Sequence, residues 1–179
     1  MRAPVISPTG VNRTFGRDEV IVSKTDLQGK LTYVNDVFVR VSRFSEEDLI
    51  GRPHNVIRHP DMPRVVFWLL WKEITAGNEI FAFVKNLSSD GAHYWVLAHV
   101  TPTIIDGRTI GYHSNRRAPD PASVAAITPI YEALLGAERA CTRPHDALQA
   151  SQQLLDQVLA DRSVTYDEFV WSIAGKEGR

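Results

Sequence analysis

Three β-rich segments in the middle of the chain restrict its fold more than any other feature. Residues 80–86, 93–101 and 109–115 are rich in β-branched and aromatic side chains. Two short turn sequences, Ser88-Ser89-Asp90-Gly91 and Asp106-Gly107, separate them. Because connections this short join antiparallel neighbours, the pattern predicts a meander of three antiparallel strands.

A further pair of β-rich segments comes earlier, at residues 20–24 and 31–34 around a turn at residues 26–29, and predicts a hairpin. Between the two groups of strands we expect short helices, at residues 36–42, from Ser45 onward and at residues 64–75. Five antiparallel strands with short helices on one face form an α+β fold, and the concave gap between the two layers can hold a small ligand.

Both ends of the chain have a different character. Residues 1–18 are rich in Pro and Gly and predict a flexible arm before a domain at residues 19–118. Residues 119–179 contain amphipathic helical patterns, opened by Asp120-Pro121 and closed by a helix with a capping box from Thr165 to Glu168. This helical extension needs a partner surface, which suits signalling or formation of a homodimer.

Charge and composition exclude several classes of function. Twenty basic against 21 acidic residues give no general attraction to nucleic acid or anionic membranes. The single cysteine, Cys141, cannot form an internal disulfide and fits the reducing cytoplasm. We expect no membrane span, because no segment reaches the ~18 apolar residues required. Catalytic motifs such as a nucleophile elbow are absent, so the sequence does not predict an enzyme.

The most specific motif is the decapeptide at residues 54–63, His-Asn-Val-Ile-Arg-His-Pro-Asp-Met-Pro. It resembles the N-terminal PAS domain of Aer-type aerotaxis receptors, and flanking segments such as Val84-Lys85-Asn86 agree in order. The resemblance covers roughly residues 20–135. It implies a PAS fold, noncovalently bound FAD, and signalling of redox or oxygen state to a downstream signalling protein or domain.

The charged part of FAD is assigned by the same resemblance to Arg58, His59 and Asp61. An arginine offers a planar set of donors for phosphate or ribityl oxygens, and a histidine adds one or two donors. A structural interpretation is also open, in which Arg58 and Asp61 form a loop ion pair and His59 caps a helix end.

The ring of a flavin needs an apolar slot and amide groups. Asn86 and Asn115 match the donors and acceptors of its imide edge, and Asn35 is a third candidate that also suits a helix N-cap. Aromatic side chains that wall the slot or simply fill the core are Phe38, Phe67, Trp68, Trp71, Phe81 and Phe83.

Two other functions remain open. A haem could replace FAD, with His99 or His113 as its ligand, because both lie on strands that we expect to pair. Alternatively, the domain is a ligand-free interaction module filled by its own side chains. Cys141 falls in the helical extension, which argues against a light-driven thiol adduct in the pocket.

Overall fold

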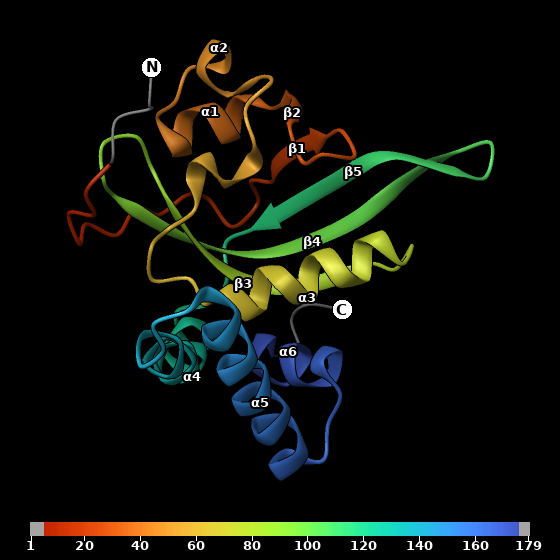
Figure 1. The fold of residues 1–179 in the computed structure, drawn as a ribbon. Coiled ribbons are helices and arrows are strands. Elements are labelled where there is room, and N and C mark those ends of the chain that lie inside the picture. Colours follow the sequence, from red (N-terminus) through yellow and green to blue (C-terminus); the bar gives the residue numbers. More distant parts are fainter. Residues whose placement is uncertain (1–5, 176–179) are drawn as a thin grey trace.

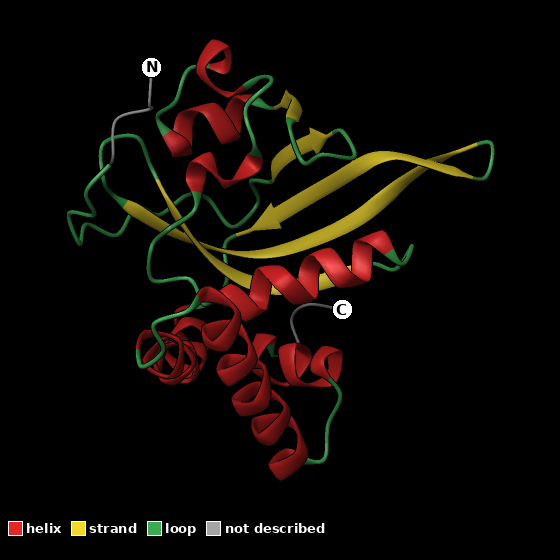
Figure 2. Ribbon diagram, viewed as in Figure 1, coloured by secondary structure: helices red, strands yellow, loops and turns green. Residues whose placement is uncertain are grey.

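The computed structural model describes residues 6–175 and contains one five-stranded antiparallel sheet. Its strand order is β2-β1-β5-β4-β3, so β1 joins the early hairpin to the later meander (Figures 1 and 2). The strands are β1 (Ile21–Thr25), β2 (Leu31–Val34), β3 (Ile80–Leu87), β4 (His93–Ile105) and β5 (Arg108–Arg117). The predicted α+β fold with a meander and a hairpin is confirmed.

Short helices connect the two groups of strands and pack on the sheet. They are α1 (Asp36–Ser42), α2 (Glu46–Leu49), the 3-10 helix η1 (His54–Ile57) and α3 (Arg64–Thr75). Asn35 caps α1 and Ser45 caps α2, each accepting a hydrogen bond from a backbone N–H three residues later. Helix α1 contacts β1, whereas α3 crosses β3 and β4 and covers the other end of the sheet.

The β4–β5 hairpin is longer than the sequence predicts and projects beyond the rest of the sheet (Figure 1). Pairing continues through an irregularity between Thr103 and Ile104 up to the turn. At the base of this projection, a Cβ on Gly111 would lie 2.2 Å from the carbonyl oxygen of Thr25. Glycine at this position therefore lets β5 approach the end of β1.

The N-terminal arm, expected to be flexible from its composition, lies against the β3–β4 turn over its described part. Backbone N–H groups of Thr9 and Arg13 donate to the carbonyls of Gly91 and His93, at 2.9 and 2.7 Å. The Arg13 side chain also pairs with Asp90 at 2.6 Å. These contacts join residues about 80 positions apart, which local composition does not reveal. Residues 1–5 lie outside the described residues.

The predicted helical extension forms α4 (Pro121–Arg139), α5 (Pro144–Arg162) and α6 (Tyr166–Ala174). The capping box between Thr165 and Glu168 is present, and α4 continues through Pro129. The three helices gather beside β3 and α3 (Figure 1). The Tyr131 hydroxyl donates to the Phe83 carbonyl at 2.7 Å, which covers part of the edge strand β3.

This packing supplies the partner surface that the amphipathic helices need. Tyr131 of α4 stacks near Trp95, and Trp171 of α6 packs on Phe81 with ring centres 4.7 Å apart. Ile127, Leu134 and Phe169 belong to the same apolar core as the sheet. The apolar faces of the extension are thus buried against its own chain. Within residues 6–175, no helix combines the length and apolar character that crossing a membrane requires.

Candidate functional site

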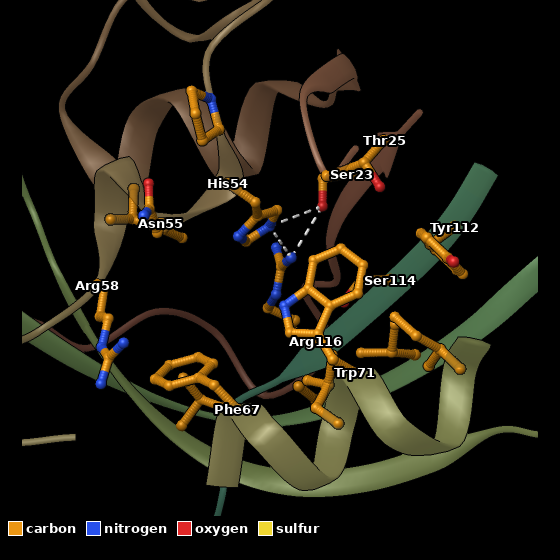
Figure 3. Close-up of a pocket in the computed structure, with 18 of the residues that line it drawn as sticks. Ser23, Thr25, His54, Asn55, Arg58, Phe67, Trp71, Tyr112, Ser114 and Arg116 are labelled. Carbon is orange, nitrogen blue, oxygen red and sulfur yellow. Dashed lines mark hydrogen bonds between the residues drawn. The ribbon is translucent and has the colours of Figure 1, made fainter. Parts of the chain in front are cut away.

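A cavity of about 370 Å³ lies between the sheet, η1 and α3 (Figure 3). Its floor comes from β-strand residues such as Ser23, Val84 and Ala98, and α3 contributes Phe67 and Trp71. Ligand sites in proteins usually measure roughly 300–1,000 Å³ and combine apolar walls with a few polar groups. The gap predicted between the two layers is therefore present and large enough for a flat ring system.

The buried Arg116 is the most unusual group in this cavity. Its Nη2 donates to the Ser23 hydroxyl at 2.8 Å and bonds to Nε2 of His54, as the dashed lines in Figure 3 show. Its guanidinium carbon lies 5.4 Å from the centre of the Phe38 ring. Burial lowers the pKa of Arg116 to about 10, so the group is still a cation at neutral pH.

His54 accepts from this cation instead of sharing its charge. Burial, followed by the positive charge of Arg116, holds the pKa of His54 well below its ordinary value. The described residues that line the cavity include two arginines and no Asp or Glu. A buried cation without a carboxylate partner costs free energy unless another group compensates it, so the cavity is suited to a ligand that carries negative charge or strong acceptors.

Three further observations point the same way. Asn86 Nδ2, Ser114 Oγ and Arg116 Nη1 are buried, and none has a hydrogen-bond partner within the described part of the chain. All three side chains line the cavity. Leaving a buried polar group without a hydrogen bond costs about 1–3 kcal/mol, so native structures contain few such groups. The two nitrogen groups are donors that find no acceptor within residues 6–175.

Arg58 lies at a different part of the cavity, half-buried, with its guanidinium carbon 4.5 Å from the centre of the Phe67 ring. Its Nη2 donates to the Met62 carbonyl at 3.2 Å. The same residue borders a second cavity of about 280 Å³, together with Val56, Pro60 and Leu87. Arg58 therefore borders both cavities, and its Nε and Nη1 have no hydrogen-bond partner among residues 6–175.

Among the other sequence candidates, Asn86, Phe67, Trp68 and Trp71 line the main cavity. Trp68 and Trp71 are partly exposed, and the Trp71 ring packs edge-on against Tyr112 at 5.5 Å. These aromatic side chains form the α3 side of the slot. From the predicted set, the structure thus brings together one amide, one arginine, three aromatic residues and one histidine, His113.

His59 and Asp61 do not line the cavity. Asp61 pairs with Lys85 at 3.5 Å and with Arg139 at 3.1 Å. The predicted ion pair between Arg58 and Asp61 is therefore wrong. Nδ1 of His59 accepts from the Asp61 N–H at 3.1 Å, which stabilises the turn before α3. Both residues therefore have structural roles outside the cavity, but not the predicted ones, because Asp61 pairs with other cations and His59 stabilises a turn and does not cap a helix.

Asn35 and Phe38 also have structural roles. The Asn35 side chain accepts from the Val22 and Phe38 N–H groups at 3.0 and 3.1 Å and donates to the Val20 carbonyl at 2.8 Å. These bonds occupy its amide and fasten α1 to β1. Phe38 is fully buried in the core and does not line the cavity.

His99 and Asn115 do not line the cavity, so the structure does not place them for their predicted roles. Alternate residues of a strand face opposite sides, and on β4 and β5 the cavity side is taken by residues such as Ala98, Ser114 and Arg116. His99 instead stacks on Phe81 and bonds to Glu79 at 2.7 Å. His113 borders the cavity, but its Nε2 bonds to Asn115 at 3.0 Å on the opposite face. His99 is therefore not placed to ligate a haem in the pocket, whereas His113 borders the cavity and its role as a haem ligand stays a prediction.

Sequence reasoning missed Arg116, His54, Ser23 and Ser114 as cavity residues. The available signal was the two-residue period of β5, which places Tyr112, Ser114 and Arg116 on one face. That period does not say which face is inward. The register of β5 against β1, which pairs Ser114 with Ser23, supplies this information.

We expect the free energy of unfolding to fall as the pH decreases from about 6.5 toward 4. Burial lowers the pKa of both His54 and His59, that of His59 to about 4 with help from Lys85. Unfolded histidines titrate near pH ~6.5, so on acidification the unfolded state takes up protons first and stability that is present above this pH is lost. Urea unfolding across this range measures the effect, and a His59→Gln variant should show a shallower decline. Constant stability would contradict the assignment.

Comparison with known proteins agrees with the fold described above. Residues 19–112 match the family model described as PAS fold. The aerotaxis receptor of Escherichia coli (strain K12) is 39% identical over 140 residues, which make up 78% of this chain and 28% of that receptor. The chain thus matches little more than a quarter of that relative.

Two solved structures show a similar fold at low sequence identity. The light-state structure of the blue-light photoreceptor Aureochrome1 LOV has a TM-score of 0.56 and 15% identity, and covers 65% of this chain and 92% of that one. A light-oxygen-voltage domain described with a flavin analogue has a TM-score of 0.55 and 14% identity, over 64% and 86% of the two chains.

Proposed function

This chain belongs to the PAS family, and we propose that it is a sensor that binds FAD noncovalently in its cavity and reports redox or oxygen state by protein contact. One observation carries the proposal. A cavity of about 370 Å³ is lined by a buried, uncompensated Arg116 and by further polar atoms of Asn86 and Ser114 that have no partner within the described residues. The similarity to an aerotaxis receptor and to a domain described with a flavin analogue supports flavin as the ligand.

The cavity residues fit a flavin ring in both shape and polarity. Phe67, Trp68 and Trp71 provide aromatic surface for a flat ring. Asn86 and Arg116 provide donors for carbonyl oxygens and ring nitrogens at its polar edge. Flavin, when bound, supplies reversible uptake of electrons and protons. The positive charge of Arg116 would favour forms of the ring that carry negative charge.

A dinucleotide is favoured over a smaller flavin by the position of Arg58. Its side chain borders both the main cavity and the second cavity of about 280 Å³. A guanidinium between two cavities is well placed to bind the anionic pyrophosphate that joins the two halves of FAD. We propose that the ring binds in the main cavity and that Arg58 binds the phosphates.

We propose that the helical extension transmits the signal from the cavity to a partner. Arg116 lies near the end of β5, four residues before Asp120, the N-cap of α4. A change in its hydrogen bonds would therefore act on the strand that leads directly into the extension. The recipient is a downstream signalling protein or domain in the cytoplasm, and we expect a homodimer. Because the apolar faces of α4 and α6 are already buried, a partner would bind other surfaces.

We expect Arg58→Ala to weaken FAD binding about ten- to a hundredfold, because a charge-assisted hydrogen bond contributes about 1.5–3 kcal/mol. Titration of the apoprotein with FAD measures this change. Arg52→Ala is a suitable control, since Arg52 is exposed and lies outside both cavities. Unchanged affinity for FAD together with unchanged affinity for FMN would refute the phosphate role of Arg58.

Thermal unfolding of the apoprotein with FAD, FMN or haem tests the ligand class. Ligand at about a hundred times its Kd stabilises the native state by about 2.7 kcal/mol. We expect FAD to raise the Tm most and FMN less, since FMN lacks the second half of the dinucleotide. A shift with haem alone would favour a haem sensor, whereas no shift with any of them would favour a ligand-free interaction module.

A further inference from the structure

The N-terminus of α3, the helix that walls the cavity, is capped by a residue from the helical extension. Helix α3 begins after Pro63, which provides no side-chain acceptor for the first backbone N–H groups, and its first turn contains no acidic residue. The first N–H groups of any helix lack partners within the helix and need an acceptor. Arg64, the first residue of α3, also carries a positive charge, which is unfavourable at this end of a helix.

Glu138 supplies the missing acceptor from a distance of 74 residues in sequence. Its Oε1 accepts from the Arg64 N–H at 2.6 Å and lies 3.4 Å from the Val65 nitrogen. Its Oε2 lies 4.0 Å from Nε of Arg64. The side chain of Glu138 is only 6% exposed, so this carboxylate is removed from water. The cap is a specific buried contact and not a surface ion pair.

The same carboxylate is poorly placed in its own helix. Glu138 is the second-last residue of α4, where the helix dipole disfavours negative charge. The amino end of α3 compensates it, so each helix end satisfies the other. Beside this contact, Arg139 of α4 pairs with Asp61 in the turn before α3 at 3.1 Å. Two successive residues of α4 thus hold the segment that starts α3.

The capped turn leads directly into the cavity wall. Phe67 lies three residues after Arg64 and lines the cavity, and the Arg58 guanidinium packs over the Phe67 ring at 4.5 Å. Burial, followed by the charge of Arg64, lowers the pKa of Arg58, and the nearby Glu138 carboxylate partly offsets this lowering. Any shift of the first turn of α3 would therefore alter both the cavity wall and the hydrogen bonds that this turn donates to Glu138.

We propose that Glu138 is a positioning residue that couples the cavity wall to the docking of the C-terminal helices, through the first turn of α3. A ligand that orders the α3 wall of the cavity strengthens the contact between Glu138 and the first turn of α3. Loss of that contact makes the α3 wall less ordered. This coupling is reciprocal, as any linkage between two sites must be. The inference rests on the proposed function only in taking a ligand such as FAD as the natural input. It adds a route to the extension that does not run through β5.

The test compares Glu138→Ala and Glu138→Gln with wild type in the full chain, using FAD as the probe and hydrogen exchange as a second readout. In Glu138→Ala we expect faster exchange at the Arg64 and Val65 amides and roughly five- to tenfold weaker FAD binding, at the lower end of typical coupling strengths. Glu138→Gln keeps an acceptor oxygen and should recover part of both effects. Glu132→Ala, an exposed position on α4, should change neither.

A perturbation from inside the cavity separates this inference from the proposed function. Trp71→Ala removes part of the wall and should change exchange in α4 and α5 when Glu138 is present, but much less in the Glu138→Ala background. This comparison needs no FAD. If wild type fails to bind FAD while the effect of Trp71→Ala on exchange still depends on Glu138, the proposed ligand is wrong and the inference stands. Equal responses to Trp71→Ala in both backgrounds, or α3 exchange unchanged by Glu138→Ala, would overturn it.

Discussion

Replacing Arg116 with Met is expected to stabilise the cofactor-free protein and to remove most of its affinity for FAD. The guanidinium is buried, and among the residues that the structure describes it has no carboxylate partner and leaves one nitrogen, Nη1, without a hydrogen bond. Substituting well-packed apolar side chains for buried charges is often neutral or stabilises by about 1–4 kcal/mol. In contrast, loss of one member of a buried, hydrogen-bonded charge pair across an interface costs about 2–5 kcal/mol, so binding should weaken roughly thirtyfold or more.

Opposite signs for the two effects are the signature of a binding residue, because sites that serve ligands are commonly kept at a cost in stability. Urea unfolding of the apoprotein and titration with FAD measure them separately. Arg117→Met is the matched control, since Arg117 is the next residue of β5 and is exposed. A less stable apoprotein with unchanged FAD affinity would show that Arg116 has a purely structural role.

Phe38→Ala is expected to reduce the free energy of unfolding by about 3–5 kcal/mol, the range observed for truncation of buried aromatic side chains. Phe38 is fully buried in the core, and its ring packs edge-on against His54 at 6.1 Å and under the Arg116 guanidinium. Equilibrium denaturation measures the loss, with the exposed Tyr33→Ala expected to stay within about 0.5 kcal/mol of wild type. Weaker FAD binding at unchanged stability would instead restore the ring-slot role predicted from sequence.

Local patterns were sufficient to predict most elements of the fold. The capping residues Asn35, Ser45 and Thr165 mark helix starts that the structure contains, and the turn at Asp106-Gly107 marks the end of the β4–β5 hairpin. These signals depend on residues a few positions apart. The attachment of the N-terminal arm to Gly91 and His93 and the burial of the extension against β3 depend on contacts across the whole chain, which periodicity does not encode.

Part of the candidate site was predictable from the chemistry of single residues, but the face of the sheet on which a strand residue lies was not. Arg58, Asn86 and the α3 aromatic residues were identified and line the cavity. Asn115 and His99 carry suitable chemistry, but the strand alternation turns them to the opposite face. Arg116 was missed because its importance comes from burial without an acidic partner, a property of the assembled sheet and helices and not of the sequence around it.

The absorption spectrum of the purified full chain, recorded before and after heat release of its bound cofactor, tests the central claim most directly. We expect flavin bands near ~450 nm from a compound that stays in solution when the protein precipitates and that matches FAD by chromatography, as for a noncovalent cofactor. If the protein carries no flavin, and its apoprotein neither binds added FAD nor changes its Tm with it, the claim is contradicted.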